Sequence, residues 1–304
     1  MELRHLRYFL VVAEERNFTR AAARLGMQQP PLSQQIRVLE SELGFELFRR
    51  HPKGAALTTG GQAFLAEATA ILLQVDAGAQ RALHVARGSL GTLALGFTTS
   101  VAAHPLTPAL IRAYRAAYPQ VSLALSEGSA AELTDAVEGG RADVALIRLP
   151  VRQPDGLCFE PLLEEEMLLV LPAGHALLPA STLSLRALAD DAFILVRRAG
   201  APGMYANLLA ACERLGFTPR VALEVEHMLT NISLVAGGAG VSMVPASMRG
   251  FHAADVAYCR IGDAVPALVA PIHAVSRGAD TRPTGHNLLA LARQLAKGWP
   301  GAAA

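Results

Sequence analysis

Apolar residues at helical spacing predict three short helices at the start of the chain. The first has an apolar face formed by Leu3, Leu6, Phe9, Leu10 and Ala13. An alanine-rich helix is expected at 20–25, because Asn17 and Thr19 before it are cap-type residues and Gly26 after it supplies a turn. A third helix follows Gly26 and buries a stripe formed by Leu32, Ile36, Leu39 and Leu43.

The third helix carries polar side chains that suit a nucleic-acid surface. Pro30 and Pro31 fit only its first turn, where missing amide donors cost nothing. Ser33, Gln34 and Arg37 lie off the apolar stripe and can donate to base edges or phosphates. The alternative is an ordinary amphipathic helix with a solvated face. Two helices joined by a glycine turn favour a DNA-binding helix–turn–helix.

A small basic hairpin is predicted directly after the third helix. Residues 46–50 and 55–57 have the pattern of two strands, and the turn between them has Pro52 and Gly54 at favourable positions. Arg49, Arg50 and Lys53 lie on this hairpin. A helix–turn–helix with a basic wing is a more specific indication of DNA binding than either part alone.

A long helix is expected from a capping box at Thr59 and Gln62 to the break at Gly88. Its apolar positions alternate at spacings of four and three, as in a coiled coil; they are Phe64, Ala68, Ile71, Val75, Gly78, Ala82 and Val85. The stripe either packs on its own domain or forms a dimer contact. Dimerisation is favoured, because DNA half-sites need two binding domains at a fixed separation.

From Thr92 onward, short β-rich runs alternate with helical stretches such as 107–118 and 130–139, which predicts α/β units with parallel sheets. Two small lobes are expected, with chain crossings at 161–166 and 262–270. The predicted strands are 93–97, 121–126, 144–147, 167–171, 193–196, 221–225, 241–244 and 272–275.

Ligands of open α/β sheets bind at the carboxyl ends of the strands, which selects a set of candidate effector-binding residues. The strongest candidates are Thr99, Ser100, Ser129, Arg148, Arg197 and His227. Hydroxyls and arginines together suggest an anion, most simply a carboxylate held by Arg148. The competing interpretation of Arg148 is a structural salt bridge with Asp143 or Glu127, and that of Arg197 is a surface charge.

Composition and charge fit a modular DNA-binding protein. Hydrophobic residues make up 52% and charged residues 17%, which excludes a disordered chain. Net charge is only +1, but residues 1–60 hold nine basic and six acidic side chains, a local charge of +3. Apolar runs are too short for a membrane span, and the charged start of the chain does not resemble a signal peptide, so a cytoplasmic protein is expected.

The cysteines and glycines show no enzyme or metal pattern. Cys158, Cys212 and Cys259 lack metal-ligand spacing, and buried free thiols are expected rather than a redox-sensing thiol. The chain has no P-loop, no H-E-x-x-H and no G-x-S-x-G motif, and the glycines at 237–240 lack dinucleotide spacing. We therefore expect no catalytic residue, no bound metal and no cofactor.

The first sixty residues resemble the DNA-binding domain of LysR-type transcriptional regulators. The matching positions are Phe18-Thr19-Arg20-Ala21-Ala22, Leu25, Gln29-Pro30, Leu32-Ser33, Gln35-Ile36, Leu39-Glu40, Leu43-Gly44, Leu47-Phe48, Arg50 and Leu57-Thr58. Gln28 departs from the family, which usually has a short hydroxyl there, and glutamine is a poor helix cap. The run LVAGGAGVSMVP at 234–245 is also similar to the family.

The resemblance implies a winged helix–turn–helix at 1–58, a linker helix for dimerisation at 59–88, and a two-lobed effector-binding domain at 89–304. This last domain is α/β and similar to periplasmic binding proteins, with lobe I at 89–163 and 267–304 and lobe II at 164–266. By analogy, Gln29, Ser33, Gln34 and Arg37 would face the DNA groove, and Arg50 and Lys53 would contact the backbone. Ser100, Ser129 and Arg148 fall where family members that control aromatic catabolism contact ligands.

The predicted function is therefore ligand-responsive regulation of transcription. The expected partners are operator or promoter duplex DNA, a small anionic effector and a second copy of the chain in a homodimer or homotetramer; RNA polymerase is a further candidate, and no membrane is expected. Two other classes remain as alternatives: a small-solute-binding protein and an α/β enzyme without a role in transcription. The winged DNA-binding motif argues against both.

Overall fold

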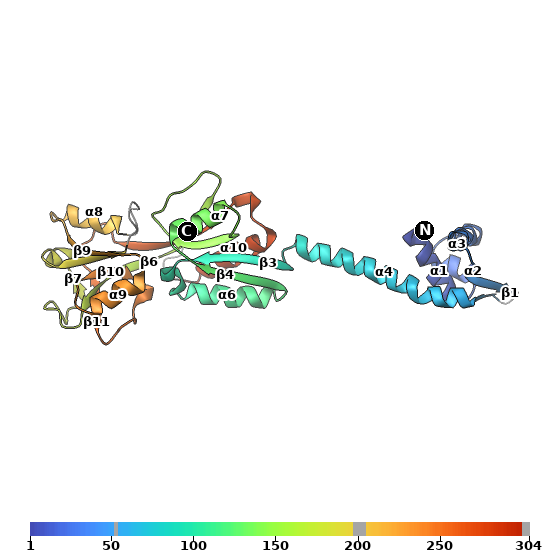
Figure 1. Cartoon of the computed structure of the whole chain (residues 1–304), viewed down its shortest axis with the longest axis horizontal. Coiled ribbons are helices and arrows are strands. Elements are labelled where there is room, and N and C mark those ends of the chain that lie inside the picture. Colours follow the sequence, from blue (N-terminus) through green and yellow to red (C-terminus); the bar gives the residue numbers. More distant parts are fainter. Residues whose placement is uncertain (52–53, 197–204, 300–304) are drawn as a thin grey trace. The chain divides into compact units, whose positions relative to one another are not determined.

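The computed structural model describes residues 1–51, 54–196 and 205–299, with the backbone alone at residue 50. The chain divides into two compact units, Met1–His84 and Val85–Ala304. Figure 1 labels many of the helices and strands of both units. Among the described helices, none is both long enough and apolar enough to cross a membrane.

The first unit is a helical domain with a two-stranded wing. Its elements are α1 (Leu3–Glu15), α2 (Phe18–Arg24), α3 (Gln29–Leu43), β1 (Phe48–His51) and β2 (Gly54–Leu57). The predicted stripe of α3 is confirmed, because Leu32, Ile36 and Leu39 are fully buried. They pack with Leu6 and Phe9 of α1 in one apolar cluster, which holds the helices in a fixed arrangement.

Local sequence sets the ends of these helices. Asn17 accepts hydrogen bonds from the amides of Thr19 (2.9 Å) and Arg20 (3.1 Å), so α2 begins two residues earlier than predicted. Gly26 has φ +66°, a left-handed conformation that favours glycine in the turn. Gln28 precedes α3 without a side-chain cap, as expected, while the two prolines lie in the first turn.

The long helix α4 (Thr59–Ala86) matches the predicted length, but its cap is Thr58 rather than Thr59. The Thr58 hydroxyl accepts the Gly61 amide at 2.8 Å, the bond that a capping residue makes with the third helical residue. The predicted capping box of Thr59 with Gln62 is therefore wrong by one residue. Thr58 and Thr59 are equally good cap residues by type, and only the hydrogen bond in the structure shows which of them caps the helix.

The apolar stripe of α4 has two different environments. Its first part, with Phe64, Ala68 and Ile71, packs into the core of the first unit, as the alternative interpretation required. Further along, the stripe is solvent-exposed at Val75 (38%) and Val85 (55%). Leu73 (63%) and Leu83 (39%) are exposed too, although neither is at a stripe position. An exposed stripe of this kind on a monomer is typical of a helix that associates with a partner.

The second unit contains an eight-stranded sheet and a separate parallel pair, β8–β9. The order along the main sheet is β4-β3-β5-β12-β6-β11-β7, and β10 pairs with β6 beside that path. The strands are β3 (Gly91–Phe97), β4 (Val121–Glu127), β5 (Val144–Arg148), β6 (Cys158–Pro172), β7 (Thr182–Leu183), β8 (Ala192–Val196), β9 (Arg220–Val225), β10 (Ser242–Pro245), β11 (Val256–Ile261) and β12 (Val269–Ser276).

Helices cover both lobes of this unit. They are α5 (Thr99–Ala102), α6 (Leu106–Ala117), α7 (Ala130–Glu138), α8 (Ala206–Arg214), α9 (Met228–Ala236) and α10 (Pro283–Ala296), with short 3₁₀ turns η1 (Leu185–Leu188), η2 (Ala246–Met248) and η3 (Gly278–Asp280). In the first lobe, α6 and α10 share one core with the sheet, whereas α7 packs against a different cluster. The second lobe has its own buried clusters around α8 and α9.

All eight predicted strands are present, but the crossing between the lobes differs from the prediction. Residues 161–166 were expected as a connection, whereas β6 is a single 15-residue strand that passes through both lobes (Figure 1). Its first half pairs with β12 and its second half with β10 and β11. The two expected sheets are thus joined into one, and the short strands β7 and β11 were not predicted.

Candidate DNA-binding surface and effector site

The predicted DNA-contacting side chains of α3 lie in two environments. Gln34 and Arg37 are exposed, as expected. Ser33 is only 8% exposed, so its placement on the exposed face was wrong. It follows Leu32 by one residue, about 100° around the helix, which leaves it at the edge of the buried face. The Gln29 amide donates to the Ser33 hydroxyl at 2.8 Å, so these two candidates form a pair.

Glu40 of α3 fixes the hairpin beside the helix. Its carboxylate accepts the amides of Leu47 (2.8 Å) and Phe48 (3.2 Å), which open the first strand of the wing. Arg49 of that strand is exposed and pairs in register with Ala56. The role of Glu40 was not predicted, because the sequence does not show which donors the carboxylate of a glutamate near the end of an amphipathic helix will meet.

The charges of the first unit divide into paired and unpaired arginines. Arg4 pairs with Glu2, and Arg24 pairs with Glu14 at 2.6 Å. Arg37 and Arg49 make no ion pair within the described residues, so both guanidiniums face solvent. The side chain of Arg50 and the whole of Lys53 lie outside the described residues. The candidate DNA-binding surface therefore has at least two arginines free to meet phosphate.

In the second unit, the parallel strands β3, β4 and β5 bring their carboxyl ends to one edge of the sheet. The Thr99 hydroxyl donates to the Glu127 carboxylate at the end of β4. Ser100, which is buried, accepts a hydrogen bond from Nε of Arg148 at 3.3 Å. Three of the candidate effector residues, Thr99, Ser100 and Arg148, thus lie in one connected region, as the strand-end rule predicts.

Arg148 is engaged in a buried ion pair whose acidic partner differs from both expected ones. Its Nη2 atom pairs with the Glu165 carboxylate, and Nη1 donates to the carbonyl of Ala270 at 2.6 Å. Burial lowers the pKa of Arg148, and the adjacent Glu165 carboxylate opposes this shift. Asp143, a predicted partner, instead accepts the Ala94 amide at 2.9 Å.

Glu165 joins the two lobes. It lies on β6, and its carboxylate also accepts the amide (2.6 Å) and hydroxyl (2.9 Å) of Ser247 in η2. The Arg148 side chain is 4% exposed and that of Glu165 is 10% exposed, so water screens the pair weakly. Glu165 was not predicted from the sequence, because it is the middle one of three consecutive glutamates. Only the alternation of side chains along β6 places it, and not its two neighbours, on the buried side.

Two further candidate effector residues, Ser129 and His227, are not connected to this network in the described structure. The Ser129 hydroxyl caps α7 by accepting the Glu132 amide at 3.3 Å, within a capping box. His227 is exposed and precedes α9 without capping it through its side chain. Arg197 lies outside the described residues. Lobe II nevertheless approaches the strand ends, because Ala103, just after α5, packs against a cluster containing Met228 of α9.

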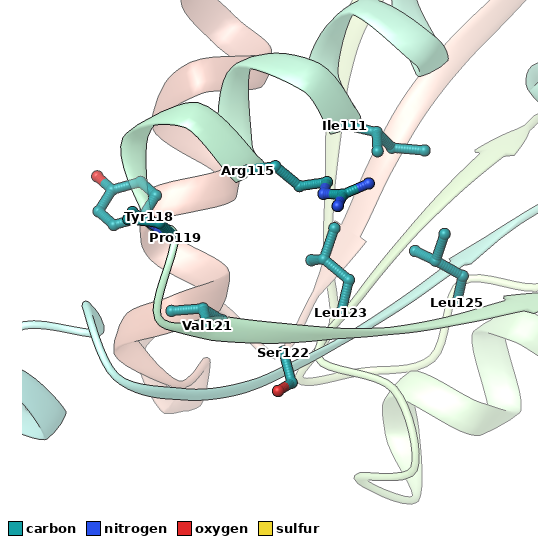
Figure 2. Close-up of a pocket in the computed structure, with 8 residues that line it drawn as sticks. All are labelled: Ile111, Arg115, Tyr118, Pro119, Val121, Ser122, Leu123 and Leu125. Atoms are coloured by element: carbon teal, nitrogen blue, oxygen red, sulfur yellow. The ribbon is translucent and has the colours of Figure 1, made fainter.

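Two cavities in the described structure are separate from these residues. The larger, with a volume of about 600 Å³, lies between α6 and the edge strand β4. Figure 2 shows Ile111, Arg115, Leu123 and Leu125 directed into this groove. A smaller cavity of about 240 Å³ lies at the start of β8 and β9. Neither is lined by any of the predicted effector residues that the structure describes.

The three cysteine thiols differ in their burial. Cys212 and Cys259 are buried as predicted, and burial raises the pKa of Cys212 to about 11. Cys158 is exposed, contrary to the expectation, because it is the first residue of β6. His104 is buried, which lowers its pKa, and its Nδ1 accepts the Leu106 amide. Within the described ranges, no cluster of His, Cys, Asp or Glu could hold a metal ion.

Comparison with known proteins identifies relatives along almost the whole chain. Residues 3–62 match the family model "Bacterial regulatory helix-turn-helix protein, lysR family", and residues 86–297 match "LysR substrate binding domain". The regulator BudR of Raoultella terrigena is 39% identical over 264 residues, which cover 87% of this chain and 91% of BudR.

Solved structures of full-length regulators agree with these matches. The crystal structure of CbnR, a LysR family transcriptional regulator, is 29% identical, covers 96% of this chain and 100% of CbnR, and has a TM-score of 0.80. CbnR in complex with its target DNA is 29% identical, with coverages of 97% and 100% and a TM-score of 0.78.

Proposed function

The chain belongs to the LysR family of bacterial transcriptional regulators, and from this premise we propose which residues contact DNA and which respond to an effector. Its relatives are DNA-binding regulators rather than enzymes, so the enzyme and solute-binding alternatives are not favoured. The proposed site of action is the cytoplasm, where the DNA is.

We propose that Gln34 and Arg37 of α3 enter the major groove of an operator and that Arg49, Arg50 and Lys53 of the wing contact its backbone. The observation that carries this proposal is the exposed, unpaired state of Arg37 and Arg49 within the described residues. We propose that Gln29 and Ser33 contact the DNA together, because the hydrogen bond between them forms one polar group at the start of α3.

A gel-shift titration on the DNA upstream of the gene for this chain tests the assignment. Arg37→Ala should weaken binding by roughly 5- to 150-fold, the loss expected when one base contact of about 1–3 kcal/mol is removed. Arg214→Gln, a charge deletion on α8 in the other unit, is the matched control and should bind normally. An unchanged footprint for Arg37→Ala would contradict the role of α3.

The effector is proposed to be a small anion, most simply a carboxylate, bound beside Thr99, Ser100 and Arg148. The observation in favour is the polar network at the strand ends, which reaches from lobe I through Glu165 to Ser247 of lobe II. Four of the five guanidinium N–H groups of Arg148 are already bonded, so an anion either takes the remaining Nη1 hydrogen or displaces one of these partners. Arg197, Ser129 and His227 are proposed as further contacts on the cleft walls.

Binding of the anion would bring the two lobes together and change the geometry of the dimer, a population shift that requires different affinities for the two states. The exposed stripe of α4 is the proposed dimer contact, and a tetramer built from two such dimers is an extension of the same proposal. RNA polymerase is proposed as a partner at activated promoters.

A thermal-shift screen of small carboxylic and aromatic acids tests the effector site. A true ligand at about 100 times its Kd should stabilise the protein by about 2.7 kcal/mol. Ser100→Ala should lose most of that stabilisation and keep DNA binding, whereas Ser122→Ala on the edge strand should behave like the wild type. A ligand response that survives Ser100→Ala would refute this location.

A further inference from the structure

Arg16 closes helix α1 in an unusual backbone conformation. Its φ and ψ angles are 46° and 26°, the left-handed region, and its amide donates to the carbonyl of Val12 at 2.9 Å. Glycine is the ordinary residue at such a helix end, because it has no Cβ atom to strain the backbone, and asparagine is the usual second choice, because its short polar side chain can bond locally. The left-handed conformation therefore gives no reason for an arginine at position 16.

The backbone of Arg16 has a structural task that does not need its side chain. Its carbonyl accepts the amide of Ala55 at 2.9 Å, which joins the wing to the end of α1. Gly54 lies so close that a Cβ atom added to it would be 2.4 Å from the same carbonyl oxygen. This contact fixes the path of the hairpin, and any residue able to adopt the left-handed conformation could supply it.

The guanidinium of Arg16 has no such task. The side chain is exposed, and it makes no ion pair or hydrogen bond within the described residues. The two acids just before it are already committed: Glu14 pairs with Arg24, and Glu15 pairs with Arg20 and Arg24. An uncompensated positive charge is thus held next to the basic wing at a position where the backbone disfavours arginine.

We propose that Arg16 contacts a DNA phosphate next to those met by the wing, so that the turn between α1 and α2 belongs to the DNA-binding surface. This inference rests on the DNA-binding role proposed for α3 and the wing. Backbone strain retained at a residue whose side chain makes no ion pair or hydrogen bond within the described residues is typical of a functional position. The attachment of Arg16 to Ala55 means that DNA bound by the wing passes beside this guanidinium.

The test is the salt dependence of binding by the full-length chain to a random-sequence duplex, which reports phosphate contacts without knowledge of the operator. Arg16→Asn keeps the left-handed backbone and removes the charge. It should bind several-fold more weakly at low salt, and the slope of log K against log salt should fall by about 0.9 for each subunit in contact. Arg16→Lys should keep the wild-type slope, because it keeps the charge.

A stability measurement separates this role from a structural one. Arg16→Gly relieves the backbone strain, so its thermal midpoint should equal or exceed that of the wild type while its DNA affinity falls. Equal slopes for Arg16→Asn and the wild type, or the same loss in the control Arg214→Gln, would overturn the role of Arg16. If the wild type itself showed no salt-dependent binding, the DNA-binding proposal would fall with it.

Discussion

The buried pair between Arg148 and Glu165 makes a quantitative prediction for stability. Replacing Glu165 with leucine leaves the guanidinium of Arg148, which is 4% exposed, without its counter-charge. It also removes two hydrogen bonds that Ser247 donates to the carboxylate. Removing one partner of a buried pair costs about 3–5 kcal/mol, because an uncompensated charge remains in a poorly solvated place.

The pair should be strongly coupled, which a double-mutant cycle measures. Arg148→Met alone should cost about as much as Glu165→Leu, whereas the double variant, which buries no charge, should cost no more than either single change. Circular dichroism during thermal unfolding is a suitable assay. For a unit of this size, a loss of 3–5 kcal/mol lowers the midpoint by roughly 6–20 °C.

An exposed cluster provides the control. Arg152 is 65% exposed and pairs with Asp135 and Glu138, so Arg152→Met should change the midpoint little. The reasoning would be refuted if the costs of Glu165→Leu and Arg148→Met simply added in the double variant. Additive costs would mean that each side chain acts through its own packing and not through their mutual attraction.

Three further predictions follow from exposure, close packing and thiol burial. Val75→Glu places a charge on the exposed stripe of α4 and should shift sedimentation from dimer to monomer without unfolding the chain; a dimer that persists would exclude that stripe. Gly88→Ala should destabilise the second unit by at least about 2 kcal/mol in urea unfolding, because the new Cβ atom would lie 2.5 Å from the backbone of Pro283 and φ is +64°. An unchanged free energy of unfolding would show that the backbone around Gly88 relaxes to admit the Cβ atom. At pH 8, Cys158 should react rapidly with a thiol reagent, whereas Cys212, with its pKa raised to about 11, should react only on unfolding; equal rates for both would contradict the burial of Cys212.

Elements with strong periodicity could be predicted from the sequence. The stripe of α3 follows from residue spacing alone, since apolar side chains must share a face to be buried. The length of α4 follows from the same spacing together with the capping residues before it and the glycine break after it. The same reasoning misplaced Ser33, because spacing defines the centre of a buried face better than its edge. It also left the environment of the α4 stripe open, since Phe64 and Val85 have the same pattern and only folding shows that one is covered and the other exposed.

Contacts between distant residues could not be predicted in the same way. The strand-end rule placed Thr99, Ser100 and Arg148 together, because parallel strands end at one edge. That rule could not predict the partner of Arg148. Glu165 lies 17 positions away on a strand that pairs antiparallel with β12, and its neighbours Glu164 and Glu166 have the same chemistry. Only the register of β6 selects the middle glutamate.

The position of Glu165 also restricts which effectors can act at this site. An anion that bonds only to Thr99 and Ser100 leaves the pair with Arg148 intact and has no direct effect on the connection between the lobes. An anion that displaces Glu165 from Arg148 leaves that carboxylate with the amide and hydroxyl of Ser247 alone, and the connection between the lobes changes. Because a ligand shifts an equilibrium only by its difference in affinity for two states, we expect the second kind of anion to be the effector. Ligands that bind without displacing Glu165 should therefore compete with the effector and leave DNA binding unchanged.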